Sequence, residues 1–295
     1  MLMRIVAIVF PVFAVIAAGW WYGRRKKPDM TFANHLNMDV FVPALVFAAM
    51  ADKSFDLVAN WGLAVGALVG VAGSGAAALL IARSSGVAAK TLVPTWMFNN
   101  CGNLGLPLAV LAFGEQALAP AVVLFLVSNL LHFSFGAWYL DHHTRLANLW
   151  KIPTVIASVA GVAVSLTHFP VWAPLKIAIK MLGDVSIPLL LFSLGVRLAS
   201  SSLSSIPLGA ASAVGRPLVG LALAFATIWA LGLEGQQRAL LIMFGALPPA
   251  VLNYVFAERY HQEPDKVASM VMIGNLAALG FIPLALTLAL PGTSF

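Results

Sequence analysis

The sequence predicts an all-α protein that crosses a lipid bilayer many times, from its composition, its membrane-length apolar segments and an internal duplication. Hydrophobic residues make up 61% of the 295 residues, charged residues make up 9%, and the mean hydropathy is +0.93. A soluble globular chain carries about 25% charged residues, so this chain cannot cover a surface that faces water. Irregular backbone and open sheet edges do not face lipid, so helices are expected throughout.

Ten apolar segments have the length of about 20 residues that a membrane-spanning helix needs. Basic residues at 24–27 follow the first segment directly, which predicts a retained helix, although Ala17-Ala18-Gly19 also fits a cleavable secretory signal. The segments cover residues 4–22, 31–51, 57–82, 91–113, 117–140, 152–168, 181–197, 207–231, 238–257 and 267–290.

The basic residues between the segments predict the orientation. Twelve Lys and Arg residues lie on the side of the loops that follow odd-numbered segments, and five lie on the other side. Cytoplasmic loops carry the excess of Lys and Arg, so both termini are expected on the non-cytoplasmic side. The net charge of +6 comes from these short loops and forms no basic patch, so nucleic acid is not expected as a partner. Cys101 is the only cysteine, which excludes an internal disulfide.

Two stretches of the chain resemble each other. Residues 36–47 align with residues 181–192 in the frame Asp-Val-x-(Val/Ile)-Pro-x-Leu-x-Phe, and Ser128-Asn129-Leu130 aligns with Gly274-Asn275-Leu276. This spacing predicts one five-helix unit in residues 1–146 and a second in residues 147–295. Because five is an odd number, the second unit enters the membrane from the opposite side, which predicts two inverted repeats of the kind that build secondary transporters.

Helix-breaking residues interrupt the fourth and the ninth segment near the middle of the membrane. Pro lacks the backbone donor and Gly weakens a helix, and interruptions at matching places in two repeats point to a binding site. The exposed amide groups of a broken helix attract an anion, and Asn side chains add donors. The alternative is a mere kink. The candidate substrate-binding residues are Asn100, Gly102, Asn103, Pro107, Pro248, Pro249 and Asn253.

Asp39 and Asp184 lie within apolar segments, each four residues after a basic residue, His35 or Lys180. A carboxylate inside the membrane is costly when charged, so these two residues are candidates for proton coupling or gating. The alternative is a structural ion pair on one helix face that fixes the kinks at the following prolines.

Three further polar residues are candidates for coupling or support. Arg216 could balance an anionic substrate or extend to the cytoplasmic surface. Asn129 and Asn275 match across the two halves, and we expect interhelical hydrogen bonds from them more than substrate contacts. We expect no catalytic residue, metal or cofactor, because no His, Cys or acidic residues have the spacing of a metal site or a nucleophile–base set.

Residues Asn100–Pro107, followed by Leu247–Tyr260 in the second half, resemble the auxin efflux carrier family, which includes bacterial transporters and plant PIN-type carriers. The resemblance covers essentially the whole chain. It implies ten helices in two inverted repeats, with helices 4 and 9 crossing at their proline breaks. It also implies a scaffold of helices 1, 2, 6 and 7, a moving transport domain of helices 3–5 and 8–10, organic-anion substrates such as auxin or dicarboxylates, and homodimers. Unlike many plant members, this chain has only about ten residues between its fifth and sixth segments.

The chain more distantly resembles the bile acid:sodium symporters, whose sodium sites use acidic and amide side chains around the same crossing. Here the ninth segment has no carboxylate near its break, because Glu258 lies nine residues after Pro249. Sodium coupling is therefore less expected, although backbone carbonyls could still bind an ion.

Together these features predict a secondary carrier or facilitator of small organic anions in a bacterial inner membrane, with its substrate at the helix 4/9 crossing and elevator-type movement. The alternatives are a sodium-coupled symporter, an anion channel, and an intramembrane enzyme that uses Asp39 and Asp184. The repeat places these two residues toward opposite sides of the membrane, which speaks against an enzyme.

Overall fold

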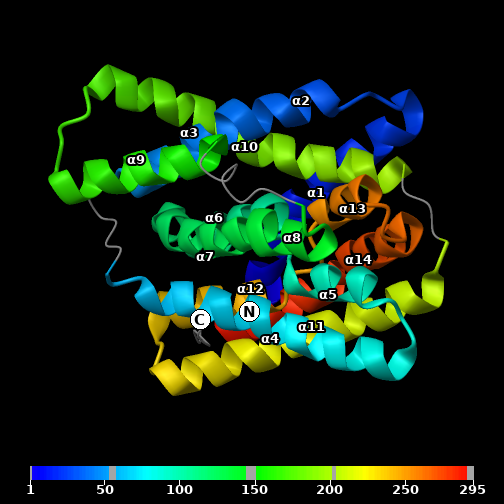
Figure 1. Cartoon of the computed structure of the whole chain (residues 1–295). Helices are drawn as coiled ribbons and strands as arrows, with labels where there is room; N and C mark the ends of the chain where they lie inside the picture. Colours follow the sequence, from blue (N-terminus) through cyan, green and yellow to red (C-terminus); the bar gives the residue numbers. More distant parts are fainter. Residues whose placement is uncertain (1, 53–57, 144–150, 201–203, 291–295) are drawn as a thin grey trace.

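The computed structural model describes residues 2–52, 58–143, 151–200 and 204–290, and these residues are almost entirely helical (Figure 1). No strand occurs among them, and their one isolated β-bridge joins Asn99 to Pro249. The repeat boundary expected at 146/147 lies outside the described residues. So do Lys53 and Arg145, two of the basic residues that predicted the orientation.

Helices lie in each of the ten expected segments. In chain order they are α1 (Leu2–Lys26), α2 (Thr31–Leu36), η1 (Asn37–Phe41), α3 (Val42–Met50), α4 (Trp61–Ser85), α5 (Ala89–Met97), η2 (Cys101–Gly105), α6 (Leu106–Phe113), η3 (Glu115–Ala117), α7 (Leu118–Leu131), η4 (His132–Gly136), α8 (Ala137–Leu140), α9 (Pro153–Thr167), α10 (Ala173–Ser200), α11 (Ile206–Leu231), α12 (Gly235–Gly245), α13 (Leu252–Arg259) and α14 (Pro264–Ala289).

Seven helices of the described chain are long and apolar enough to cross a membrane on their own, and α9 and Cys101–Phe113 are shorter apolar helices. The ninth expected segment is divided between α12 and α13, so neither half is long enough alone. The fold is therefore that of a multi-pass membrane protein, and the count of ten crossings in inverted order stays a prediction.

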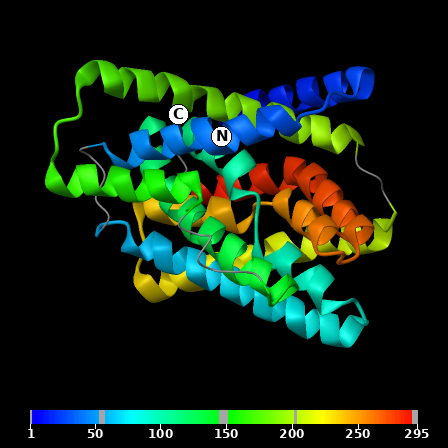
Figure 2. The ribbon, with the colours of Figure 1, turned by 45° about the horizontal axis from the view of Figure 1, so that its top comes forward.

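The helices pack in two groups. In the first group α1 and α3 pack against α10, and α9 packs against α3; in the second, α4, α5, α7, α11, α12, α13 and α14 pack on one another. Figure 1 shows α3, α9 and α10 on one side of the molecule and α4, α11 and α12 on the opposite side, with α6 and α7 between them, and Figure 2 shows the same order from another direction.

The backbones of α1 and α10 touch at two glycines. A Cβ atom on Gly195 of α10 would lie 2.7 Å from the backbone nitrogen of Trp20, and a Cβ atom on Gly19 of α1 would lie 2.9 Å from the carbonyl carbon of Phe192. Small residues let membrane helices approach closely where lipid offers no hydrophobic driving force for helix association. These two glycines therefore allow the close contact between α1 and α10.

The two aligned Asp-Pro stretches differ in local structure. The first contains the π-helical turn η1, which ends two residues before Pro43, whereas α10 continues as an α-helix through Pro188. A π-helical turn contains one extra residue and occurs where the regular ladder of backbone hydrogen bonds in a helix is interrupted. The kink expected at both prolines is thus accompanied by a π-helical turn at only one of them.

We predict that Gly195→Leu lowers the melting temperature of the purified protein in detergent. The added side chain would overlap the α1 backbone, and overpacking costs about 1–3 kcal/mol. Gly280→Leu is the matched control, because a Cβ atom on Gly280 would meet no atom within 4 Å. Equal melting temperatures for the two variants would contradict the close α1–α10 contact.

Candidate functional site

Two broken helices cross near the centre of the chain. Helix α5 ends at Met97 and α12 ends at Gly245, and the extended segments that follow run antiparallel to each other. The backbone amide of Asn100 donates to the carbonyl oxygen of Pro248 at 2.8 Å, and the amide of Ala250 donates to the oxygen of Phe98 at 2.9 Å. Buried backbone groups must be paired, so each break supplies partners to the other.

Asparagine side chains complete the crossing. The Asn100 amide donates to Asn275 Oδ1 at 2.9 Å, and Asn275 Nδ2 donates to the carbonyl oxygens of Val271 at 2.8 Å and Pro249 at 3.1 Å. Asn253 Nδ2 donates to the Phe98 oxygen at 2.9 Å. Asn275 therefore ties α14 to both broken segments. Asn129, its counterpart in the first half, is half-buried and makes no side-chain hydrogen bond within the described chain.

The other residues predicted for the site lie on both sides of the breaks. Pro107, Pro248 and Pro249 are buried, and Pro107 lies in the first turn of α6. Gly102 and Asn103 are half-buried in the π-helical turn η2, where a Cβ atom on Gly102 would lie 3.1 Å from the Phe125 ring. The Asn103 side chain forms no hydrogen bond with the described residues.

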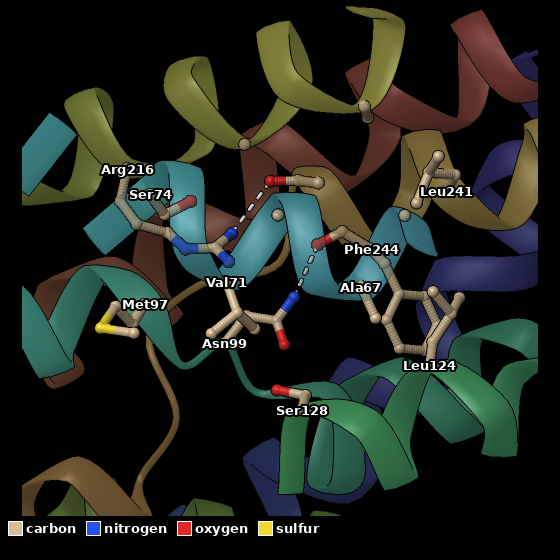
Figure 3. A pocket seen from close by; sticks show the side chains of 15 residues that line it. Ala67, Val71, Ser74, Met97, Asn99, Leu124, Ser128, Arg216, Leu241 and Phe244 are labelled. Carbon is tan, nitrogen blue, oxygen red and sulfur yellow. Dashed lines mark hydrogen bonds between the residues drawn. The ribbon is translucent and has the colours of Figure 1, made fainter. Parts of the chain in front are cut away.

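A small cavity adjoins the crossing and lies among α4, α7, α11 and α12 (Figure 3). None of the substrate-binding residues predicted from the sequence lines it. Apolar residues and glycines form most of its wall, and the polar side chains in it are Ser74, Asn99, Ser128 and Arg216.

Sequence reasoning missed three of these four polar residues. Asn99 Nδ2 donates to the Phe244 carbonyl oxygen at 2.8 Å, whereas Asn99 Oδ1 and Ser74 Oγ are buried without a partner in the described chain. Ser74 could have been found from its spacing, since Gly66, Gly70 and Ser74 recur every four residues and all line the cavity. Ser128 had no such signal beyond its place in the second repeat match.

Arg216 is buried, with 3% of its surface exposed, so its guanidinium does not extend to the surface. Its Nη1 donates to the Gly245 oxygen at 2.9 Å (Figure 3) and also to the Leu247 oxygen, at the C-terminal end of α12. Its Nε has no hydrogen-bond partner, and no carboxylate of the described chain forms an ion pair with it. A buried charge without a counter-charge marks a functional site in a membrane protein.

Asp39 and Asp184 are exposed on the surface of the chain. Lys180 and Asp184 form the expected ion pair, with Nζ and Oδ1 2.8 Å apart, and 57% of the Asp184 side chain is exposed. His35 and Asp39 form no ion pair within the described chain. Neither carboxylate lines the cavity.

A buried histidine packs on both broken segments. The His132 ring of η4 stacks on the Phe98 ring with centroids 4.0 Å apart and meets the edge of Phe256 at 4.9 Å. Gly136 makes room for this stack, since a Cβ atom there would lie 2.7 Å from the Phe98 ring. His132 thus packs as a core residue at the crossing, and its Nε2 has no hydrogen-bond partner in the described chain.

We predict that Asn275→Ala lowers the melting temperature clearly more than Asn129→Ala does. The first change leaves the Asn100 amide and the Pro249 oxygen without partners, and each unsatisfied buried group costs about 1–3 kcal/mol. The second removes no hydrogen bond, and such changes stay within about 0.5 kcal/mol. Thermal unfolding in detergent measures both, and equal losses would contradict the role of Asn275 in holding the crossing.

Comparisons with known proteins place the chain among transporters. The sequence profile of a family described as "Membrane transport protein" matches residues 4–140 and 142–286. A "Putative malonate transporter" of Rhizobium meliloti (strain 1021) is 26% identical, with 99% of each chain covered. Auxin efflux carrier component 2 of Arabidopsis thaliana is 33% identical over 44% of this chain and 21% of its own length. The chain therefore belongs to the membrane transport protein family, which is the family of the auxin efflux carriers.

Proposed function

We propose that this membrane transporter is a secondary carrier of small organic anions, with carboxylates as its substrate class. The observation that carries this proposal is the buried Arg216 guanidinium, which adjoins the crossing and has no carboxylate partner in the described chain. A fixed positive charge in a water-poor site favours an anionic ligand. The named relatives are transporters, and the name of the Rhizobium relative refers to a dicarboxylate, malonate.

The helix ends at the crossing also favour an anionic ligand. Helices η2–α6 and α13 begin there, so their N-terminal ends carry partial positive charge. Helix α12 ends there with partial negative charge, which Arg216 offsets. The carbonyl of Phe98, next to the end of α5, accepts from Ala250 and Asn253. The balance of these ends is positive, which suits a carboxylate.

In this proposal the substrate lies against the crossing, among the residues predicted from the sequence. Asn103 donates from its unpartnered amide, and Gly102 gives access to the backbone of η2. Asn253 Nδ2 donates to the Phe98 oxygen, so its Oδ1 can only accept a hydrogen bond, from a hydroxyl or protonated carboxyl group of the substrate. Asn100, Pro107, Pro248 and Pro249 hold the shape of the crossing. Support or coupling is the role that we assign to Asn129, Asn275, Asp39 and Asp184.

The division of the helices into two groups supports movement of the elevator type. The group that contains α4, α7, α11 and α12 holds the whole cavity and the crossing. In our proposal the expected helices 3–5 and 8–10 move as the transport domain against a scaffold of the expected helices 1, 2, 6 and 7. The scaffold would pair in a homodimer in a bacterial inner membrane, with both termini on the non-cytoplasmic side.

We predict that small mono- or dicarboxylates raise the melting temperature of the purified protein, whereas the uncharged amides of the same acids do not. A ligand at 100 times its dissociation constant stabilises the folded state by about 2.7 kcal/mol. Asn103→Leu and Asn253→Leu should abolish the shift, and Asn34→Ala in α2 should keep it. A shift that survives both leucine variants would contradict the proposed site, and the lack of any carboxylate shift would contradict the substrate class.

We further predict that unlabelled carboxylate inside proteoliposomes accelerates the uptake of the labelled compound from outside. A carrier that alternates between two states returns faster with a substrate bound, and its flux saturates, whereas a channel gives flux proportional to the driving force. The initial uptake rate, measured with and without internal carboxylate, separates the two. Linear flux without counterflow would support a channel and contradict the carrier.

A further inference from the structure

Arg216 occupies a setting of oxygen atoms that would otherwise suit a small cation. We propose that its guanidinium is a built-in substitute for a coupling cation, so that the carrier binds its substrate without sodium. This inference deepens the proposed function and rests on it only for the transport measurement.

The oxygen atoms around Arg216 come from a broken helix. Arg216 Nη1 donates hydrogen bonds to the carbonyl oxygens of Gly245 and Leu247. The neighbouring carbonyl oxygen of Phe244 accepts a hydrogen bond from Asn99 Nδ2. Broken transporter helices use unwound carbonyls and C-terminal half-helix ends to coordinate sodium ions. In this chain a tethered cation and a neutral amide take those carbonyls instead.

The cavity contains further oxygen atoms without partners. Ser74 Oγ and Asn99 Oδ1 are both buried and have no hydrogen bond within the described chain. Figure 3 shows Ser74 beside Arg216, and Asn99 and Ser128 across the cavity from it. Neutral carbonyl, amide and hydroxyl oxygens suit a hard cation. None of the polar residues in this cavity is acidic, so the guanidinium is its only source of charge.

A backbone contact brings Arg216 to this position. A Cβ atom on Gly245 would lie 2.6 Å from the carbonyl oxygen of Gly220, so α11 and α12 touch there. Arg216 lies one helical turn before Gly220, and its side chain runs along this contact to the end of α12. This close approach brings the carbonyl oxygens at the end of α12 within reach of a side chain of α11.

The position that corresponds to Arg216 in the first half has no basic side chain. At the 145-residue offset of the repeat, Val71 of α4 corresponds to Arg216, and it lines the same cavity. The Phe98 carbonyl beside the end of α5 accepts from Asn253 and from a backbone amide, so it needs no cation. Arg216 therefore gives the second half a positive charge that position 71 of the first half lacks, and this charge is permanent, because a guanidinium does not lose its proton in proteins.

Replacement of this side chain tests the proposal without any substrate. Arg216→Ala should melt at a lower temperature than wild type in choline chloride, and low concentrations of guanidinium or sodium ions should restore part of the loss in a saturable way. Wild type should give no such response. Arg83→Ala, at the exposed end of α4, is the matched control and should behave like wild type. An Arg216→Ala protein that responds to these cations no more than wild type does would overturn the proposal.

A second measurement covers the case in which Arg216→Ala does not fold. Wild-type protein should bind and take up carboxylate equally well when choline replaces sodium throughout, and Arg216→Lys, which keeps a tethered cation, should do the same. A requirement for sodium in the wild type would overturn the proposal. If no carboxylate binds under any condition, the proposed substrate class fails, but the cation response of Arg216→Ala still decides this inference.

Discussion

The structure depends on one constraint: backbone groups that a broken helix releases inside a membrane must find partners within the protein. Two breaks that cross meet this constraint together, because Asn100 donates to Pro248 and Ala250 donates to Phe98. Either break alone would leave these groups unpaired in a region without water. The crossing is therefore a joint product of both halves of the chain.

The net charge of the site depends on which side chains pair with the backbone groups at the remaining helix ends. Side-chain amides serve most of them, through Asn99, Asn253 and Asn275, and these neutral groups leave the local charge unchanged. The end of α12 is different, because a permanent cation serves it. The sign of this one buried charge links the geometry of the crossing to the class of ligand that we propose, and the relatives' names agree with that class.

The sequence predicted the helical fold and both breaks, because proline, glycine and asparagine in an apolar segment act locally. It could not predict which asparagine does what. In extended backbone adjacent side chains point to opposite faces, so Asn99 reaches Phe244 and the cavity while Asn100 reaches Asn275. Nor could it predict that Asp39 is exposed, because a helix with apolar residues on all faces gives no sign of which face is inside.

A cross-link between the two breaks tests the crossing most directly. Asn99 and Pro249 form a pair without mutual hydrogen bonds, whose Cα atoms lie about 4.5 Å apart in antiparallel backbone, within the span of a disulfide. In a Cys101→Ala background, cysteines at 99 and 249 should oxidise to a disulfide that keeps the two halves together after proteolysis at a site inserted between α8 and α9. A second protein with cysteines at 99 and 252 tests a different register of the two segments. The account would be contradicted if the halves separated with cysteines at 99 and 249 but stayed linked with cysteines at 99 and 252.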